Sequence, residues 1–259
     1  MTAPAAPTEA GHVALAIADG VATIRFSHPK GNSLPGALLR RLADAVREAG
    51  AASEARVVVL RSEGSGPFCA GASFDELRAI RDAATGKEFF LGFARLILAM
   101  RACPKFVLVR VHGKAVGGGV GVAAAADYAL AARGASVKLS ELAVGIGPFV
   151  VGPVIEKRIG AGPFTALAVD AASWRDAAWA ERHGLYAGVH EGVEELDTAL
   201  DALARTLAAS SPEAMAALKR VFWEGTEHWD RLLDERAEMS GTLVLSTFAR
   251  EAIERFGKR

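Results

Sequence analysis

Two glycine-rich turns are the parts of this sequence whose residue types and spacing could do chemistry. They are "FCAGAS" and "AVGGGVG", and each follows a strand-forming stretch and precedes a helix-forming one. The first N–H groups of a helix have no partner inside it and carry partial positive charge. Two such turns side by side could hold one oxygen that becomes negative, as an oxyanion hole does. Alternatively, the small residues only allow close helix packing, and the glycine run by itself leaves both interpretations open.

Glu141 is the third candidate, because it lies among apolar residues in "SVKLSELAVGIGPFVVGP". Burial disfavours the charged form of a carboxyl group and raises its pKa, which suits it to proton transfer near neutral pH. Taken alone, a solvated loop acid is the simpler interpretation. The neighbouring turns are what make a catalytic carboxylate worth considering.

Composition limits the possible partners. The chain has 259 residues, with 30 basic and 30 acidic side chains and no block of like charge, so neither nucleic acid nor an anionic membrane is an evident partner. Only two cysteines occur, Cys69 and Cys103, which suits a reducing cytosol. The first residues, "MTAPAAPTEAGH", lack the features of a signal peptide, and no long apolar stretch follows. We expect a soluble cytoplasmic protein.

The apolar periodicity predicts an α/β core over residues 12–190 and a helical section over 191–259, after a flexible N-terminus at 1–11. A hairpin opens the core, with Asp19-Gly20 as its tight turn. Strands are expected at 55–63, 105–113 and 128–132, and a helix is expected directly after the glycine run. Further helices are expected at 35–50, 73–84 (begun by Ser73), 87–103, 153–169, 174–183, 193–209, 212–222 and 227–257.

The ordered set of motifs resembles the crotonase family, which is the enoyl-CoA hydratase/isomerase superfamily. The motifs are "HPKGNSLPGALLRRL", "GPFCAGASFDEL", "VHGKAVGGGVGVAAAADYALAA", "SELAVGIGP", "SSPEAMAALKR" and "REAIERFGKR", so the resemblance spans nearly the whole chain. It implies a crotonase-like core of repeated ββα units in a superhelix. It also implies that the helical C-terminal section assembles the chain into a homotrimer or a dimer of trimers.

The resemblance implies that backbone N–H groups of Ala72 and Gly118 donate to the thioester oxygen of an acyl-CoA substrate, and that Glu141 is the general acid/base. The reaction would pass through a thioester enolate, with no metal and no cofactor besides the coenzyme A of the substrate. We expect the acyl pocket to be lined by the helix after Ser73 and by "GPFVVGP". The residues expected to contact coenzyme A are Lys30, Asn32, Ser33, Leu34, Ala70, Ala72, Gly117 and Gly118, with Phe256 and Lys258 closing a CoA site of this or a neighbouring subunit.

One position departs from the family's hydratases, which carry two glutamates. The later one matches Glu141, with Gly145 and Pro148 in register, but the earlier one aligns with Gly121. That carboxylate normally helps to orient water, so we expect proton transfer through Glu141 to outpace hydration of a simple enoyl-CoA. Asp75 or Glu76 is the candidate replacement. A dehydratase, hydrolase or decarboxylase acting on a specialised acyl-CoA remains an alternative, as does a non-catalytic CoA-binding homologue.

The other residues with reactive side chains are expected to have structural roles. We expect Asp127 and His112 to be structural, and Cys69 to be a small packed residue rather than an activated thiolate. The four tryptophans are expected in the core or in an interface. The apolar residues of the helical tail exceed what one domain edge needs to bury, which favours assembly through them: Phe222, Trp223, Leu232, Leu233, Leu243 and Leu245.

Overall fold

The computed structural model describes residues 11–256, so the predicted flexible segment, apart from Gly11, and Lys258 lie outside the described residues. A six-stranded sheet forms the centre, in the order β1-β2-β3-β4-β6-β9. Its β1–β2 hairpin is antiparallel, and every later pair is parallel. The strands are β1 (His12–Ala18), β2 (Val21–Ser27), β3 (Val57–Ser62), β4 (Val107–Val111), β6 (Tyr128–Ala132) and β9 (Gly188–His190).

The hairpin turn has the conformation that its sequence predicts. Asp19 and Gly20 have φ angles of 50° and 79°. A two-residue turn of type I′ needs positive φ at both positions, which aspartate tolerates and glycine adopts without strain. The predicted opening hairpin is therefore confirmed.

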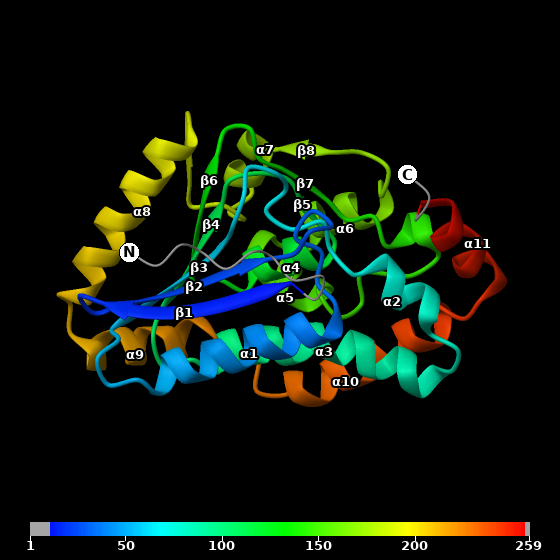
Figure 1. The fold of residues 1–259 in the computed structure, drawn as a ribbon, viewed down its shortest axis with the longest axis horizontal. Coiled ribbons are helices and arrows are strands. Elements are labelled where there is room, and N and C mark those ends of the chain that lie inside the picture. The colour runs from blue at the N-terminus through cyan, green and yellow to red at the C-terminus, as the bar shows by residue number, and fades with distance from the viewer. Residues whose placement is uncertain (1–10, 257–259) are drawn as a thin grey trace.

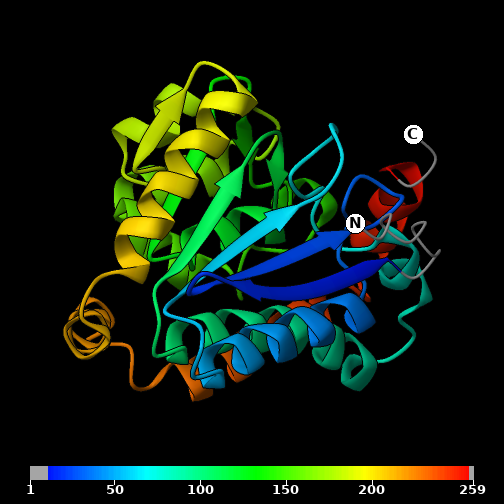
Figure 2. The ribbon, with the colours of Figure 1, turned by 60° about the vertical axis from the view of Figure 1, so that its left-hand side comes forward.

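A second, three-stranded sheet of β5 (Ala115–Val116), β7 (Ser136–Lys138) and β8 (Arg175–Asp176) lies beyond the first. Figure 1 shows α1, α3 and α10 below the large sheet and α8 along its other side, and Figure 2 shows the same layers turned. The helices are α1 (Gly36–Ala51), α2 (Phe74–Ala79), α3 (Ala83–Ala102), α4 (Gly118–Ala124), α5 (Gly152–Ile159), α6 (Ala161–Val169), α7 (Ala177–Arg182), α8 (Val193–Ala208), α9 (Pro212–Phe222), α10 (Trp229–Leu243) and α11 (Thr247–Phe256).

Strand β3 explains why the central strands are apolar without alternation. Val57 and Val59 belong to a cluster that includes Leu196 and Leu200 of α8. The side chains between them, such as Val58, point to the opposite face and join the main core. Because helices cover both faces of this sheet, every position of such a strand can be apolar.

Four predicted helices differ from the structure. The segment 73–84 divides, because α2 ends at Ala79 before the extended Ile80, and Ala83 already begins α3. The segment 153–169 divides into α5 and α6 at Gly160, whose φ of 80° interrupts the helix. The segment 174–183 begins with β8 before α7 starts, because Arg175 and Asp176 pair with β7. The segment 227–257 divides into α10 and α11, with 244–246 between them. The sequence pattern also missed the short strands β5, β7, β8 and β9, which are too brief to show a period.

The C-terminal helices pack on the rest of the same chain. α8 contacts β3, β4 and β6, α10 packs along α3, and α11 contacts α2. Within residues 11–256 no helix is both long and apolar enough to cross a bilayer.

This packing removes part of the reason given above for assembly. Trp223 and Leu233 are buried within the subunit, so they need no partner chain. Phe222 and Leu243 do stay exposed, at 49% and 38%, and Leu232 and Leu245 are half-buried against the core. Trimer formation and the boundary near residue 190 remain predictions.

Asp127 has the structural role expected of it. Its carboxylate accepts hydrogen bonds from Lys219 Nζ at 2.7 Å, from the Val107 amide at 2.7 Å and from Trp223 Nε1 at 3.0 Å. The Asp127 and Lys219 side chains are each 3% exposed, and Nζ also donates to the carbonyl oxygens of Met100 and Lys105. A fully satisfied buried pair of this kind fastens α9 to β4 and to the start of β6.

Replacing Asp127 with alanine should lower the free energy of unfolding by about 3–5 kcal/mol, because the Lys219 ammonium would stay buried without a counter-charge. Urea denaturation measures the change. Asp44→Ala is the matched control, since that carboxylate is 73% exposed in its pair with Arg47 and contributes little. Equal effects of the two substitutions would contradict the structural role of Asp127.

Candidate active site

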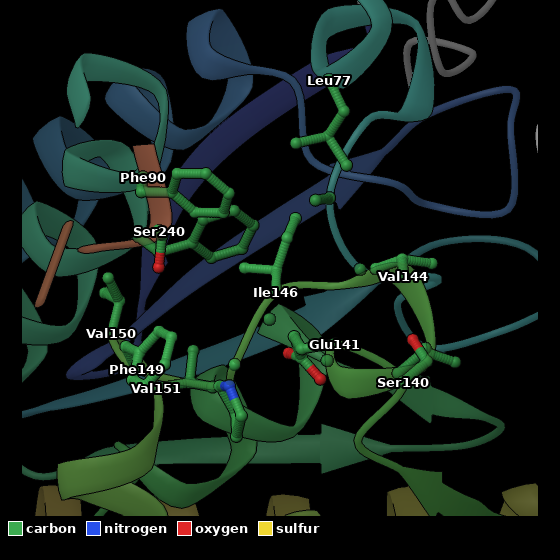
Figure 3. A pocket seen from close by; sticks show the side chains of 18 of the residues that line it. Leu77, Phe90, Ser140, Glu141, Val144, Ile146, Phe149, Val150, Val151 and Ser240 are labelled. Atoms are coloured by element: carbon green, nitrogen blue, oxygen red, sulfur yellow. The ribbon is translucent and has the colours of Figure 1, made fainter. Parts of the chain in front are cut away.

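One pocket collects most of the residues predicted to do chemistry. Ala70, Ala72, Gly117, Gly118 and Glu141 all line it. The rest of the wall is almost entirely apolar (Figure 3). Part of it comes from the two segments that the sequence indicated, α2 and "GPFVVGP": Phe74, Leu77, Phe149, Val150 and Val151. The remainder comes from α3 and from the turn after Glu141: Phe90, Phe93, Val144 and Ile146. The cavity volume is about 70 Å³, which is room for a compact acyl group or several waters.

Backbone pairing brings the two glycine turns side by side. The Cys69 amide donates to the Lys114 carbonyl at 3.1 Å, and the Val116 amide donates to the Cys69 carbonyl at 2.9 Å. Directly after this pairing, one segment reaches Ala72 and the other reaches Gly118, the first residue of α4. Neither of these two amides donates to another residue of the described chain. The pocket therefore has two free backbone donors on its wall.

The glycines allow the backbone to lie directly against the Glu141 carboxylate and an apolar side chain. Gly117 has a φ of 51°, and a β-carbon there would be 2.8 Å from Oε1 of Glu141. A β-carbon at Gly118 would be 2.0 Å from Cε1 of Phe93. Any side chain at either position would displace the carboxylate or the ring, so the glycine run is explained by what it must approach.

The residue Glu141 is half-buried, but its carboxylate is withdrawn from solvent. It precedes a short 3₁₀ turn, Leu142–Val144, and its carbonyl oxygen accepts from the Ile146 amide at 2.9 Å, which fixes the backbone. Its Oε2 is buried and has no hydrogen-bond partner within the described chain. Loss of solvation raises the pKa of this carboxyl group from 4.5 to about 7. At neutral pH it can accept or donate a proton with little bias.

The space beside Gly121, where the hydratases of the family carry a glutamate, is filled in this protein. A β-carbon at Gly121 would lie 2.5 Å from Cγ1 of Val151, and Val151 is itself 5% exposed. An apolar side chain from the segment before α5 thus fills the volume into which a residue at position 121 would project.

Neither proposed replacement reaches the pocket. Asp75 is on the surface, where it forms ion pairs with Lys30 and Arg78. Glu76 accepts a hydrogen bond from the Gly36 amide at 2.7 Å and so stabilises the start of α1. The structure therefore speaks against both candidates for the missing glutamate, because each carboxylate has partners outside the pocket.

The residues expected to contact coenzyme A divide into two groups. Ala70, Ala72, Gly117 and Gly118 line the pocket, as described above. The other group is Lys30, Asn32, Ser33, Leu34 and Phe256, which do not line it, and Phe256 is 42% exposed at the end of α11. Their coenzyme A contacts stay predictions.

The loop before α1 uses its polar side chains internally. Asn32 donates to the carbonyl oxygens of Glu63 and Pro67 at 3.0 and 2.9 Å, and its Oδ1 accepts from the His28 amide at 2.9 Å. Ser33 Oγ is 3.0 Å from His28 Nδ1, and the buried Leu34 donates its amide to Gly71 at 2.8 Å. The loop therefore supports the first glycine turn from outside the pocket.

Two other reactive residue types are unsuited to chemistry here. Burial raises the pKa of the Cys69 thiol to about 12, so a nucleophilic thiolate is not available. His112 lies outside the pocket, and burial lowers its pKa. Both agree with the packed roles expected from the sequence.

Ser240 is a pocket residue that sequence reasoning missed. It comes from α10, far along the chain from the motifs, and a serine within a helical stretch carries no signal that distinguishes it from a surface residue. Only the packing of α10 on α3 brings it to this site.

The fold and the pocket define a crotonase-type α/β protein, and comparison with known proteins agrees. The sequence pattern of the family described as "Enoyl-CoA hydratase/isomerase" matches residues 16–257. The chain therefore belongs to the enoyl-CoA hydratase/isomerase family.

Similar proteins carry different activity names. A (7aS)-7a-methyl-1,5-dioxo-2,3,5,6,7,7a-hexahydro-1H-indene-carboxyl-CoA hydrolase of Mycobacterium tuberculosis is 31% identical over 77% of this chain and 79% of its own length. A probable enoyl-CoA hydratase of Bacillus subtilis is 25% identical over 94% and 95%. The solved structure of a putative enoyl-CoA hydratase from Mycobacterium avium paratuberculosis K-10 superposes with a TM-score of 0.85 and 28% identity, covering 95% of this chain and 96% of that one.

The buried Glu141 predicts a pH-dependent stability. The folded chain holds the proton up to about pH 7, whereas an unfolded glutamate releases it near 4.5. As the pH rises through this window, the unfolded state loses its proton first, so the free energy of unfolding should fall, by up to about 3 kcal/mol.

Glu141→Gln should lack this decline and be the more stable protein at pH 8, with the difference vanishing near pH 4.5. Urea denaturation across this range, with the exposed Glu48→Gln as control, measures it. Parallel pH profiles for wild type and Glu141→Gln would show that the carboxyl group is not buried in solution.

Proposed function

We propose that this protein is an acyl-CoA enzyme that forms a thioester enolate. In this proposal the N–H groups of Ala72 and Gly118 donate to the thioester oxygen, and Glu141 moves the proton of the adjacent carbon. The observation that carries the proposal is the Glu141 carboxylate: its Oε2 is buried without a hydrogen-bond partner among the described residues, its pKa is about 7, and it faces the same pocket as the two free amides. Such preorganised donors stabilise the charge that develops on a carbonyl oxygen.

The proton transfer needs one carboxylate. Ionised Glu141 takes a proton from the α-carbon, the electrons of that C–H bond move toward the carbonyl, and the resulting enolate oxygen is held by the two amides. Protonated Glu141 then returns the proton to the α-carbon, or to the γ-carbon when a double bond is conjugated. The first outcome is isotope exchange and the second is double-bond isomerisation.

Hydration of a simple enoyl-CoA is less well supported, although the Bacillus subtilis relative is named for it. Water must be held against the β-carbon while another group supplies the α-proton. Within the described pocket lining, Glu141 is the only ionisable residue, and Val151 fills the space beside Gly121.

Hydrolysis of an oxo-substituted acyl-CoA is a second candidate, favoured by the Mycobacterium tuberculosis relative, a hydrolase named for a dioxo carboxyl-CoA. Glu141 would take a proton from water, whose oxygen adds to a ketone carbon β to the thioester. The bond between this carbon and the α-carbon then breaks, its electrons form the enolate, and Glu141 returns the proton to the α-carbon. The products are a carboxylic acid and a shortened acyl-CoA, and one carboxylate serves both steps.

Isotope exchange tests the proposal without knowledge of the acyl group. In D₂O, the protein should introduce deuterium at the α-carbon of short saturated and unsaturated acyl-CoA thioesters, as followed by mass spectrometry. Glu141→Gln should reduce the exchange rate at least about a hundredfold, the usual contribution of a positioned acid/base. Glu48→Gln should leave it unchanged. Exchange that is absent from wild type, or undiminished in Glu141→Gln, would refute the mechanism.

Two further substrates distinguish hydrolysis from double-bond isomerisation. In ¹⁸O-labelled water, a hydrolase should release a labelled carboxylic acid from β-oxo acyl-CoA thioesters. An isomerase should leave these thioesters intact and should move the double bond of 3-enoyl thioesters.

The space beside Gly121 gives a further prediction. Gly121→Glu alone should fold poorly, because its β-carbon would overlap Val151. Gly121→Glu combined with Val151→Gly removes the overlap and restores a second carboxylate, so hydration of crotonyl-CoA should rise above the wild-type rate. Val151→Gly alone is the control for the loss of volume. Equal hydration by the double variant and this control would contradict the role given to the missing carboxylate.

A further inference from the structure

Ser240 is a buried residue that lines an otherwise apolar part of the pocket. The residue is 1% exposed and lines the cavity, and Figure 3 shows its oxygen near Phe90, across the pocket from Ser140. Its hydroxyl makes no hydrogen bond to any residue in the described part of the chain. Other helical hydroxyls of this protein, such as Thr198 and Thr206, bond to the carbonyl four residues earlier, but Ser240 does not.

A close contact between two helices sets the position of Ser240. A β-carbon at Gly86 of α3 would lie 2.7 Å from the carbonyl oxygen of Gly241, and one at Gly241 would lie 2.4 Å from the Lys87 amide nitrogen. The two backbones touch at this point, so α10 comes close enough for the short side chain of Ser240 to reach the pocket wall.

We propose that Ser240 determines specificity by hydrogen-bonding a neutral oxygen, a ketone or hydroxyl, on the acyl group remote from the thioester. The inference rests on the proposed function, since it assumes that an acyl group fills this pocket. Buried polar groups in proteins are almost always paired, so an unpaired one aimed into a binding pocket calls for a partner on the ligand. Because no cation lines the pocket within the described residues, a second carboxylate on the substrate is the less suitable partner.

The position of the Ser240 hydroxyl in an apolar wall lets the pocket distinguish acyl groups that carry an oxygen from those that do not. A ligand with an oxygen at the right carbon satisfies the hydroxyl, whereas a plain alkyl chain covers it and leaves it unpaired. Sites that bond a substrate hydroxyl or carbonyl reject the analogue that lacks it for this reason.

Binding affinities test the inference separately from turnover. The probes are saturated acyl-CoA thioesters of one length, each with a single ketone at a different carbon, and the unsubstituted thioester of the same length. By isothermal titration calorimetry, at least one ketone position should bind wild type about tenfold more tightly than the unsubstituted thioester, the effect of one neutral hydrogen bond. Ser240→Ala should abolish this preference without weakening the unsubstituted ligand, and Ser140→Ala, on the opposite wall, should retain it.

Ser240→Cys gives a second test, because it keeps the size of the side chain with a much weaker donor, and it should also lose the preference. The inference is overturned if no ketone position is preferred by wild type, or if the preference survives in Ser240→Ala or Ser240→Cys. Thioesters that bind with the predicted preference but undergo no α-exchange would refute the enolate proposal alone. Failure of every thioester to bind would refute both.

Discussion

The contact between the Gly117 backbone and the Glu141 carboxylate is the constraint on which the site depends. A β-carbon at Gly117 would be 2.8 Å from Oε1 of Glu141, so the carboxylate occupies the place of a missing side chain. The amide of Gly117 donates to the Lys138 carbonyl at 2.9 Å, and this bond ties the glycine turn to the strand that leads to Glu141. One packed contact thus joins the first turn of α4 to the Glu141 carboxylate.

Exclusion of water from the Glu141 carboxylate is what raises its pKa. Phe93 lies against Gly118, and the residues of 146–151 close the pocket around the carboxylate, so Glu141 loses solvation and its pKa rises to about 7. The same close packing places Val151 against Gly121. Glycine at position 121 and Val151 in the adjacent space together keep this part of the pocket apolar, and Glu141 is the only ionisable residue of the described pocket lining.

The helical tail completes the site from a distance in sequence. α10 packs along α3 and contributes Ser240, while α11 contacts α2 and the turn after Glu141. The buried Asp127–Lys219 pair fastens α9, which leads into this tail, to the central sheet. The pocket is thus built by both halves of the chain, and the division into a core and a tail describes the sequence better than it describes the packing.

The sequence by itself determined the hairpin, the long amphipathic helices, the family and the residues of the two glycine turns, because turn chemistry and apolar periodicity are local and the motifs have a fixed order. It also identified Glu141 and the missing glutamate at Gly121. Only the tertiary structure decided that Glu141 is buried, that Asp75 and Glu76 bond elsewhere, that Val151 fills the space beside Gly121, and that Ser240 reaches the pocket. Burial and side-chain partners depend on contacts between segments distant in sequence, and neither residue type nor spacing encodes which segments will meet.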